Sequence, residues 1–285
     1  MEDVMKILTA FFALILIAGC VTPPTKEEIA NLDYGSCPNT HLEKIKSHFQ
    51  SGLLTAYEGE PVIWPPRKFW YQSMDASRSF DIGKLYAGYL VPVMANKTRG
   101  LSDMDFPGGE QIYGFLFKND ELVKLISPVT MAQLTISEQF GPLPTDKRDW
   151  KIGNSGGKGN QSIVEWVIQG ESVQNWSELI TVQTFARVPL KITPEYLAKG
   201  AESSFKKRCA RVTQTTLFTT RTETTVERAA SECAPSRDEY TIEKYVRGPY
   251  TIHHVGYAKT APLNESERQK WTALIKQATI FGDCK

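Results

Sequence analysis

The sequence predicts an α+β protein with two small regions, each an antiparallel sheet with one or two packed helices. Two observations carry this prediction. Segments rich in β-branched and aromatic residues are separated by turn signals, which is typical of strands. Three other segments repeat apolar residues at helical spacing behind a residue suited to cap a helix. Because most strands follow one another without a helix between them, we expect antiparallel pairing.

The first region is expected to span residues 31–128 and to begin with a helix. Thr40 is a suitable N-cap, and Glu43 three residues later would complete a capping box. One face of this helix should be buried, because apolar residues recur at helical spacing at Leu42, Ile45, Phe49 and Leu53. Strands are predicted at 85–93, 111–117 and 122–126. Asn119-Asp120 should form a tight turn between the last two strands.

Four segments of this region resemble small bacterial envelope lipoproteins of uncharacterised function. They are Asp33-Tyr34-Gly35, the amphipathic helix, and the strands Tyr86–Val93 and Tyr113–Phe117. The similarity extends over residues from about 30 to 128, and its motifs are structural. It implies an envelope location and transfers no catalytic residue. The proline-rich stretch Pro61–Pro66 departs from the pattern, and its Pro65-Pro66 pair suggests an exposed binding loop.

Residues 129–161 are predicted to be a linker, because prolines, glycines and charged residues gather there. The second region, residues 162–285, has the predicted order β-β-α-β-β-β-β-α, with the helices on one side of the sheet. Thr193 should cap its first helix, with Pro194 at the first helical position. Asn264 and Glu267 should box the start of its last helix.

The start of the chain has the pattern of a bacterial lipoprotein signal peptide, assigned to residues 1–19. Lys6 precedes the apolar run Ile7–Ala18, which is too short to span a bilayer. Ile17-Ala18-Gly19-Cys20 resembles the lipobox. The resemblance implies cleavage before Cys20 and a diacylglycerol and palmitate anchor on its thiol. Because Glu2 and Asp3 are unusual before such a run, translation is expected to begin at Met5.

Residues 20–30 are predicted to be an extended tether, since Pro23 and Pro24 block a helix. The residue after Cys20 is Val21, not the Asp that is typical of lipoproteins kept in the inner membrane of enteric bacteria. This resemblance to enteric sorting implies the periplasmic face of the outer membrane. The membrane, reached through the lipid, is thus one expected partner, and an envelope protein is another.

An oxidising compartment makes disulfides the expected use of the cysteines left after lipidation of Cys20. Four cysteines allow three pairings. Cys209–Cys233 is favoured because the two residues flank a predicted hairpin, which leaves Cys37–Cys284. No two of the four are close enough in sequence for a zinc knuckle, so no metal site is predicted.

Composition gives no electrostatic case for a nucleic-acid partner, and none is expected. The net charge is +1, and removal of residues 1–19 leaves 32 Lys+Arg against 30 Asp+Glu, or +2. The sequence contains no phosphate-binding or metalloprotease motif, and no cofactor is expected. His253-His254 is not expected to bind metal, because neighbours on a strand point to opposite faces. One of these histidines should face the core and the other solvent.

Ser155 is the one candidate nucleophile. Gly153–Gly157 resembles the nucleophile loop of chymotrypsin-like proteases and fits G-x-S-x-G. However, His41 and His48 lie in a predicted helix, and the residues before Ser155 are too polar for the buried strand of an α/β-hydrolase. The linker interpretation is therefore preferred, and no catalytic residue is assigned.

Three hypotheses for function follow. The leading one is a non-enzymatic, membrane-anchored periplasmic lipoprotein that binds an envelope protein or the wall. The second is a tethered serine hydrolase that uses Ser155. The third is a small-ligand-binding lipoprotein, which would show an aromatic-lined pocket. Four tryptophans are candidates to line such a pocket, although core positions are more usual for them: Trp64, Trp70, Trp166 and Trp176.

Acylation of Cys20 predicts that the native protein incorporates a clickable fatty-acid analogue and fractionates with membranes. The expected readout is a labelled band in the envelope fraction after metabolic labelling. An unlabelled protein recovered with the soluble cytosol would contradict both the anchor and the compartment.

Overall fold

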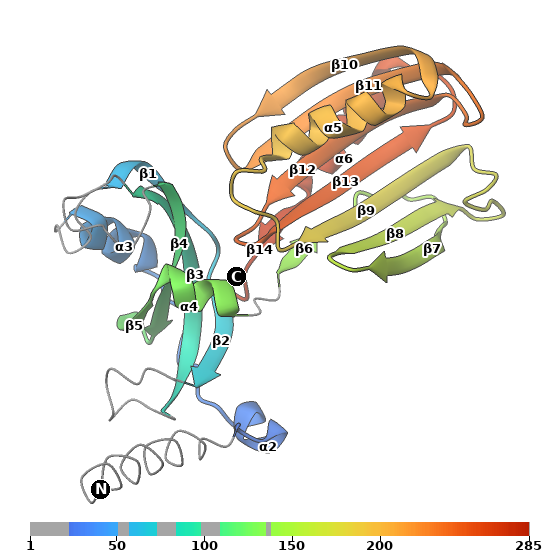
Figure 1. The fold of residues 1–285 in the computed structure, drawn as a ribbon. Helices are drawn as coiled ribbons and strands as arrows, with labels where there is room; N and C mark the ends of the chain where they lie inside the picture. The colour runs from blue at the N-terminus through green and yellow to red at the C-terminus, as the bar shows by residue number, and fades with distance from the viewer. Residues whose placement is uncertain (1–22, 51–56, 73–83, 98–108, 135–137, 285) are drawn as a thin grey trace, which may run out of the picture.

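The computed structural model describes residues 23–50, 57–72, 84–97, 109–134 and 138–284. The protein is mostly β, with 50% of the described residues in strands and 20% in helices. The strands form sheets of five, seven and two strands (Figure 1). The predicted α+β class is therefore wrong. It undercounts strands because three of them, at 57–63, 67–72 and 150–158, carry prolines, charges or glycines that lower β propensity. No helix among the described residues could cross a membrane.

The five-stranded sheet is built on its longest strand, β3. Its strands are β1 (Tyr57–Ile63), β2 (Arg67–Gln72), β3 (Leu85–Lys97), β4 (Gly109–Lys118) and β5 (Glu121–Ile126). The order is β1-β3-β4-β5. Strands β1 and β2 both pair with the same edge of β3: β2 with its first half and β1 with its second half. Asn119 and Asp120 have positive φ in the β4–β5 turn, which confirms the predicted hairpin.

One helix packs on each face of this sheet. Helix α3 (His41–Gln50) buries Ile45, while the predicted face is partly wrong because Leu42 is 49% exposed. Helix α4 (Pro128–Gln133) buries Met131 against the other face. The segment before α3 is fixed by Asp120, whose Oδ1 accepts hydrogen bonds from the backbone N–H of Asn39 and Thr40 at 2.7 and 2.9 Å.

The seven-stranded sheet joins two meanders. Its strands are β7 (Trp150–Lys158), β8 (Gln161–Ile168), β9 (Glu178–Ala186), β10 (Cys209–Thr219), β11 (Glu223–Cys233), β12 (Glu239–Arg247) and β13 (Thr251–Lys259). The order is β10-β11-β12-β13-β9-β8-β7, with every pair antiparallel. The β9–β13 ladder therefore unites strands 7–9 with strands 10–13.

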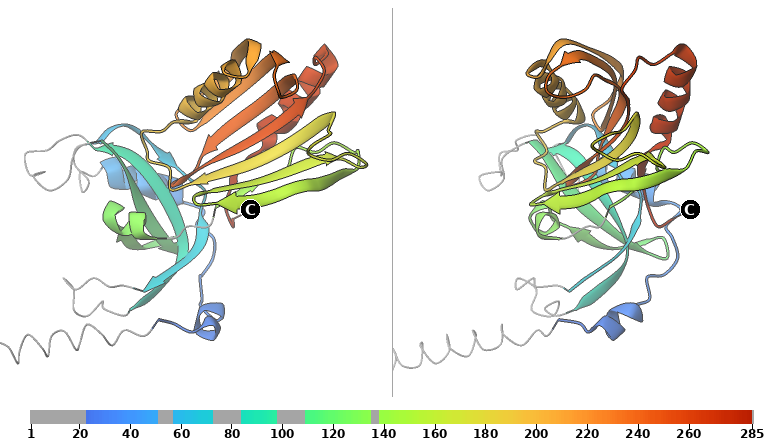
Figure 2. Two further views of the ribbon diagram at one scale, coloured as in Figure 1. Left: turned by 45° about the vertical axis from the view of Figure 1, so that its right-hand side comes forward. Right: turned by 90° about the vertical axis from the view of Figure 1, so that its right-hand side faces the viewer.

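Two helices cover opposite faces of this sheet, not one face as predicted (Figure 2). Helix α6 (Glu265–Gln277) buries Trp271 and Ile275 against Ile242 and Tyr257. Helix α5 (Pro194–Lys206) buries Ala198 on the face that carries Tyr245 and Ile252. Sequence patterning misses this arrangement because both faces of β12 and β13 are covered, so these strands lack a clean alternation.

The caps of both helices agree with the sequence prediction. Thr193 Oγ1 accepts from Tyr196 N at 3.1 Å with Pro194 in the first turn, and Asn264 forms a capping box with Glu267. Near the start of the described chain, Thr25 and Glu28 form another capping box. It begins α2 (Lys26–Ala30), so this part of the predicted extended tether is helical.

The predicted linker is structured. It contains α4, β6 (Gln139–Gly141) and β7, and β6 pairs with β14 (Thr279–Phe281) near the end of the chain. Strand β7 forms despite its glycines because the β8 backbone supplies its hydrogen bonds. As the edge strand it needs little core of its own, and Ile152 is 60% exposed.

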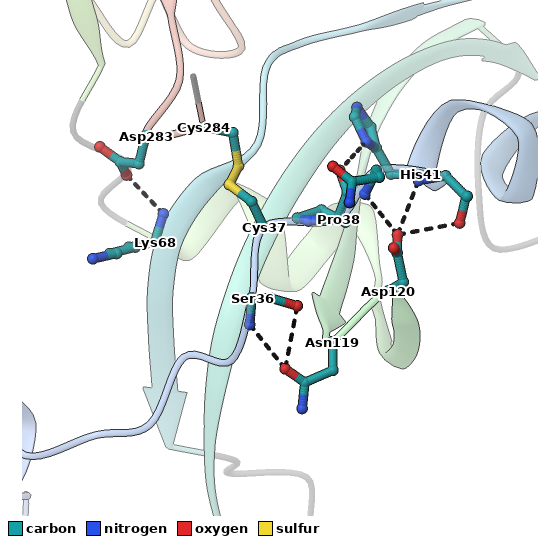
Figure 3. Close-up of a disulfide and its surroundings, with 11 residues drawn as sticks. Ser36, Cys37, Pro38, His41, Lys68, Asn119, Asp120, Asp283 and Cys284 are labelled. Atoms are coloured by element: carbon teal, nitrogen blue, oxygen red, sulfur yellow. Dashed lines mark hydrogen bonds between the residues drawn. A yellow bond between two sulfur atoms is a disulfide. The ribbon is translucent and has the colours of Figure 1, made fainter.

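The C-terminal tail is fastened to the start of the five-stranded sheet (Figure 3). Cys37 and Cys284 lie at disulfide distance, with Cα atoms 5.8 Å apart. Beside them, Asp283 N donates to Pro66 O at 3.0 Å, and Lys68 N donates to Asp283 Oδ2 at 2.7 Å. Together with the Cys209–Cys233 pair across β10 and β11, this pairing agrees with the one favoured from the sequence.

The Pro65-Pro66 pair before β2 is not exposed, because Pro66 is buried and Pro65 is half-buried, so the interpretation of an exposed binding loop is wrong. Trp64 is only 6% exposed, and its Nε1 donates to Arg247 O of β12 at 3.1 Å. Arg67 Nη2 donates to Phe281 O at 2.9 Å. Leu190 and Tyr250 also pack against the core cluster that contains Trp64. The two large sheets are therefore held together by apolar contacts as well as by the tail.

The Cys37–Cys284 bond closes a span of 247 residues, against 24 for Cys209–Cys233. Loop-closure entropy predicts that Cys37→Ser/Cys284→Ser lowers the free energy of unfolding by about 2 kcal/mol more than Cys209→Ser/Cys233→Ser does. Chemical denaturation of both double variants under oxidising conditions measures the difference. An equal or reversed ranking would contradict the constraint assigned to the tail.

Candidate functional site

A cavity of about 520 Å³ lies between α5 and the seven-stranded sheet. We call it the α5 cavity. Its apolar lining includes Trp176, Leu179, Phe185, Leu197 and Phe205. Its polar lining includes Glu165, Thr181, Gln183, Arg228, Glu239, Thr241, Glu243 and His254. The cavity is therefore amphipathic, with aromatic and aliphatic walls beside a charged floor.

Strand register places the polar side chains on this one face. Arg228 of β11 lies opposite Thr241 of β12, and Glu243 lies opposite Gly256 of β13. Because side chains alternate along a strand, Thr241 and Glu243 share a face, while Ile242 points into the core under α6. Helix α5 lines the opposite side of the cavity with one stripe of residues at helical spacing: Leu197, Gly200, Ala201 and Phe205.

An ion pair between Arg228 and Glu243 forms the floor. Arg228 Nη1 donates to Glu243 Oε1 at 2.6 Å, and the two side chains are 1% and 8% exposed. Thr241 Oγ1 and Tyr245 OH donate to the same carboxylate at 2.8 and 2.7 Å. Arg228 also donates from Nε and Nη2 to Gln214 Oε1 at 3.0 and 2.8 Å. Buried charges with this many partners are held in one arrangement.

This network sets the protonation of its members. Burial works to raise the pKa of Glu243, but attraction to Arg228 and the surrounding hydrogen bonds outweigh it and hold the pKa well below its ordinary value. Burial, reinforced by the negative charge of Glu243, raises the pKa of Tyr245. The floor is therefore a fixed anion–cation pair with a neutral phenol, and it is a poor source of protons for catalysis at neutral pH.

Glu239 differs from Glu243 because its partner is distant. Its Oε1 lies 3.6 Å from Nη2 of Arg208, whose side chain is 40% exposed. Burial raises the pKa of Glu239 and outweighs the opposing attraction to Arg208. Glu165 on β8 accepts one hydrogen bond, from Asn154 Nδ2 at 2.7 Å. These two carboxylates are the less saturated acceptors of the cavity.

The two neighbouring histidines lie on opposite faces, as predicted, but neither faces open solvent. His254 lines the α5 cavity and stacks on Tyr245, with ring centroids 4.7 Å apart. His253 is 4% exposed, and its Nε2 and Nδ1 lie 3.1 and 3.0 Å from Glu138 Oε2 and Thr184 Oγ1. Among the described residues no group of His, Cys, Asp and Glu has the geometry to hold a metal ion.

The structure does not bring the proposed hydrolase residues together. Ser155 is exposed in β7, opposite Val164, so neither the nucleophile loop nor the flexible linker describes it. His41 and His48 lie in α3, on the other large sheet. Cys20 lies outside the described residues.

Of the four tryptophans considered as pocket residues, Trp176 lines the α5 cavity. Trp64 and Trp166 pack with core clusters, the more usual role. Sequence analysis misses the charged floor. Strand β12 contains four charged residues, Glu239, Glu243, Lys244 and Arg247, so no pattern in the sequence marks Glu243 as a buried charge.

A scan against protein-family models and a search of curated proteins both found no match for this chain.

Removal of one member of the floor pair should be far more harmful than removal of both. Arg228→Met leaves the Glu243 carboxylate buried without its counter-charge, and we expect it to cost about 3–5 kcal/mol at pH 7. Arg228→Met/Glu243→Leu should recover most of this loss, as measured by denaturant unfolding.

The pH dependence supplies a control for the same variant. Without Arg228, burial raises the pKa of Glu243, so the folded state gains from protonation. The stability deficit of Arg228→Met relative to the wild type should then shrink as the pH falls toward 4.5, the ordinary pKa of this carboxyl. A deficit that is constant with pH would show that the pair does not act through charge.

Proposed function

We propose that the protein is a lipid-anchored periplasmic binding protein that holds a small ligand in the α5 cavity. The cavity is the observation that carries this proposal. Its volume of about 520 Å³ lies within the 300–1,000 Å³ typical of small-molecule sites. Its mixture of apolar walls and a few convergent polar groups is also typical of such sites.

The architecture supports binding more than catalysis. The carboxylate of Glu243 in the charged floor accepts hydrogen bonds from Arg228, Thr241 and Tyr245. Because these internal bonds saturate it, the floor offers no free nucleophile. In the described residues, Ser155 has neither a histidine nor a carboxylate as a hydrogen-bond partner. A non-enzymatic role, the leading hypothesis from the sequence, therefore remains our proposal, with a small ligand in place of a protein partner.

The lipoprotein signal at Cys20 supports the location that we propose. Residues 23–50 lead from that end of the chain to the five-stranded sheet, while the α5 cavity belongs to the seven-stranded sheet. In this arrangement the five-stranded sheet and its helices connect the lipid anchor to the rest of the protein, and the seven-stranded sheet carries the binding site.

The cavity can be filled from α5 without disturbing the floor. Gly200 lines the cavity, and a Cβ placed there has no heavy atom within 4 Å. Gly200→Phe adds a ring on the stripe that faces the cavity and removes a helix-weakening glycine. We expect it to bind the fluorescent apolar probe N-phenyl-1-naphthylamine at least about tenfold more weakly than the wild type, with no loss of thermal stability.

Lys199→Phe is the matched control, since it places the same ring on the same helix at a side chain that is 67% exposed. It should bind the probe as the wild type does. Absence of saturable binding to the wild type, or equal binding to Gly200→Phe, would refute the cavity as the binding site.

A further inference from the structure

We propose that the α5 cavity takes an amphipathic organic cation, meaning an amine or ammonium group joined to an apolar body. This inference rests on the proposed function and adds the chemical class of the ligand. It follows from the separation of apolar and acidic groups over the lining, and from which charges a ligand can reach.

The apolar body has an extended surface to contact. Trp176 and Leu179 lie at one side of the cavity, and Leu197 and Phe205 of α5 cover the other. Aromatic and aliphatic walls of this kind bind apolar groups without selecting among them. The class of head group must therefore be decided by the polar lining.

The charge that a ligand meets is negative. Arg228 and Glu243 cancel each other in the floor, where both are under one-tenth exposed. Glu239 is 20% exposed, and Glu165 is also partly exposed. After the floor pair is set aside, the lining contains two carboxylates and no lysine or further arginine.

The lining offers an anionic head group no lysine, and no arginine outside the floor pair. The imidazole of His254 also lines the cavity, but its Nε2 faces the floor carboxylate, 3.5 Å from Glu243 Oε2. The Nε, Nη1 and Nη2 atoms of Arg228 already donate to Gln214 and Glu243. Arg208 lies outside the lining and stacks on Phe205, with its guanidinium carbon 4.2 Å from the ring centroid. A carboxylate or phosphate ligand would therefore approach Glu165 and Glu239 without compensation, which is strongly unfavourable in a partly desolvated site.

Glu239 is the acceptor best placed for a cation. Its contact with Arg208 at 3.6 Å is longer than a charge-assisted hydrogen bond, which is about 2.7–2.9 Å. Burial raises the pKa of Glu239 despite the attraction to Arg208, so Arg208 does not fully compensate the charge of this carboxylate. A ligand ammonium would supply the missing partner, and Arg208 has solvent on its other side to move into.

The test compares three ten-carbon probes that differ in head group: decylammonium, 1-decanol and decanoate. Binding is measured by isothermal titration calorimetry at pH 7, below micelle formation. The full chain with Cys20→Ala is used, so that no protein-borne lipid competes. We expect decylammonium to bind about tenfold or more tightly than 1-decanol, and decanoate to bind most weakly.

Two variants assign the preference to the acidic lining. Glu239→Gln should weaken decylammonium binding by about tenfold and leave 1-decanol unchanged, and Glu165→Gln/Glu239→Gln should abolish the difference between them. Glu195→Gln is the matched control. It removes one negative charge from the same domain at a helix position that is 49% exposed and paired with Lys199.

The outcomes separate the two proposals. The preference for a cationic ligand is refuted if 1-decanol binds as tightly as decylammonium does, or if the advantage of decylammonium survives Glu165→Gln/Glu239→Gln. In both cases the proposal that the cavity binds a small ligand is retained. Tighter binding of decanoate than of decylammonium has the same meaning. If none of the three probes binds, both the cavity and its ligand class are refuted.

Discussion

The pairing of β9 with β13 is the constraint on which the C-terminal architecture depends. Nine residue pairs, from Thr251–Ala186 to Lys259–Glu178, join segments separated by 65 to 81 positions in the chain. Without this ladder, the β7–β9 and β10–β13 meanders would be separate sheets, each too narrow to bury two faces. With it, one face provides the core under α6 and the other provides the floor of the α5 cavity.

The two faces of that sheet show how differently one set of strands can be used. Under α6, Trp271 stacks on Tyr257 with ring centroids 3.7 Å apart, and the surrounding cluster is apolar. On the α5 side, Glu243 and Arg228 occupy positions where a core would have aliphatic residues. Replacing a buried ion pair by apolar side chains is often neutral or stabilising. Its presence at the base of a cavity supports the ligand-binding role that we propose for this face.

Local signals in the sequence predicted local structure well. The Thr193-Pro194 and Asn264–Glu267 caps, the Asn119-Asp120 turn and the β10–β11 hairpin with its cysteines depend on neighbouring residues, and each lies where it was expected. Strands β1, β2 and β7 were missed because their strand state depends on partners elsewhere in the chain: β1 and β2 each pair with β3, and β7 pairs with β8. The cavity was missed for the same reason. Arg228 and Glu243 are 15 positions apart, and only the register of β11 on β12 brings them together.

The bond between Cys37 and Cys284 makes the chain a covalent ring closed near its two ends. Cys37 stands 17 positions after Cys20, so whatever holds the start of the chain also holds its last turn. A protease that cuts any single peptide bond between residues 38 and 283 therefore releases no fragment. Both pieces stay linked to the N-terminal segment before Cys37 until a reductant cleaves the disulfide. In the periplasmic location that we propose, the disulfide would keep a cleaved chain in one piece, however tightly either sheet is folded.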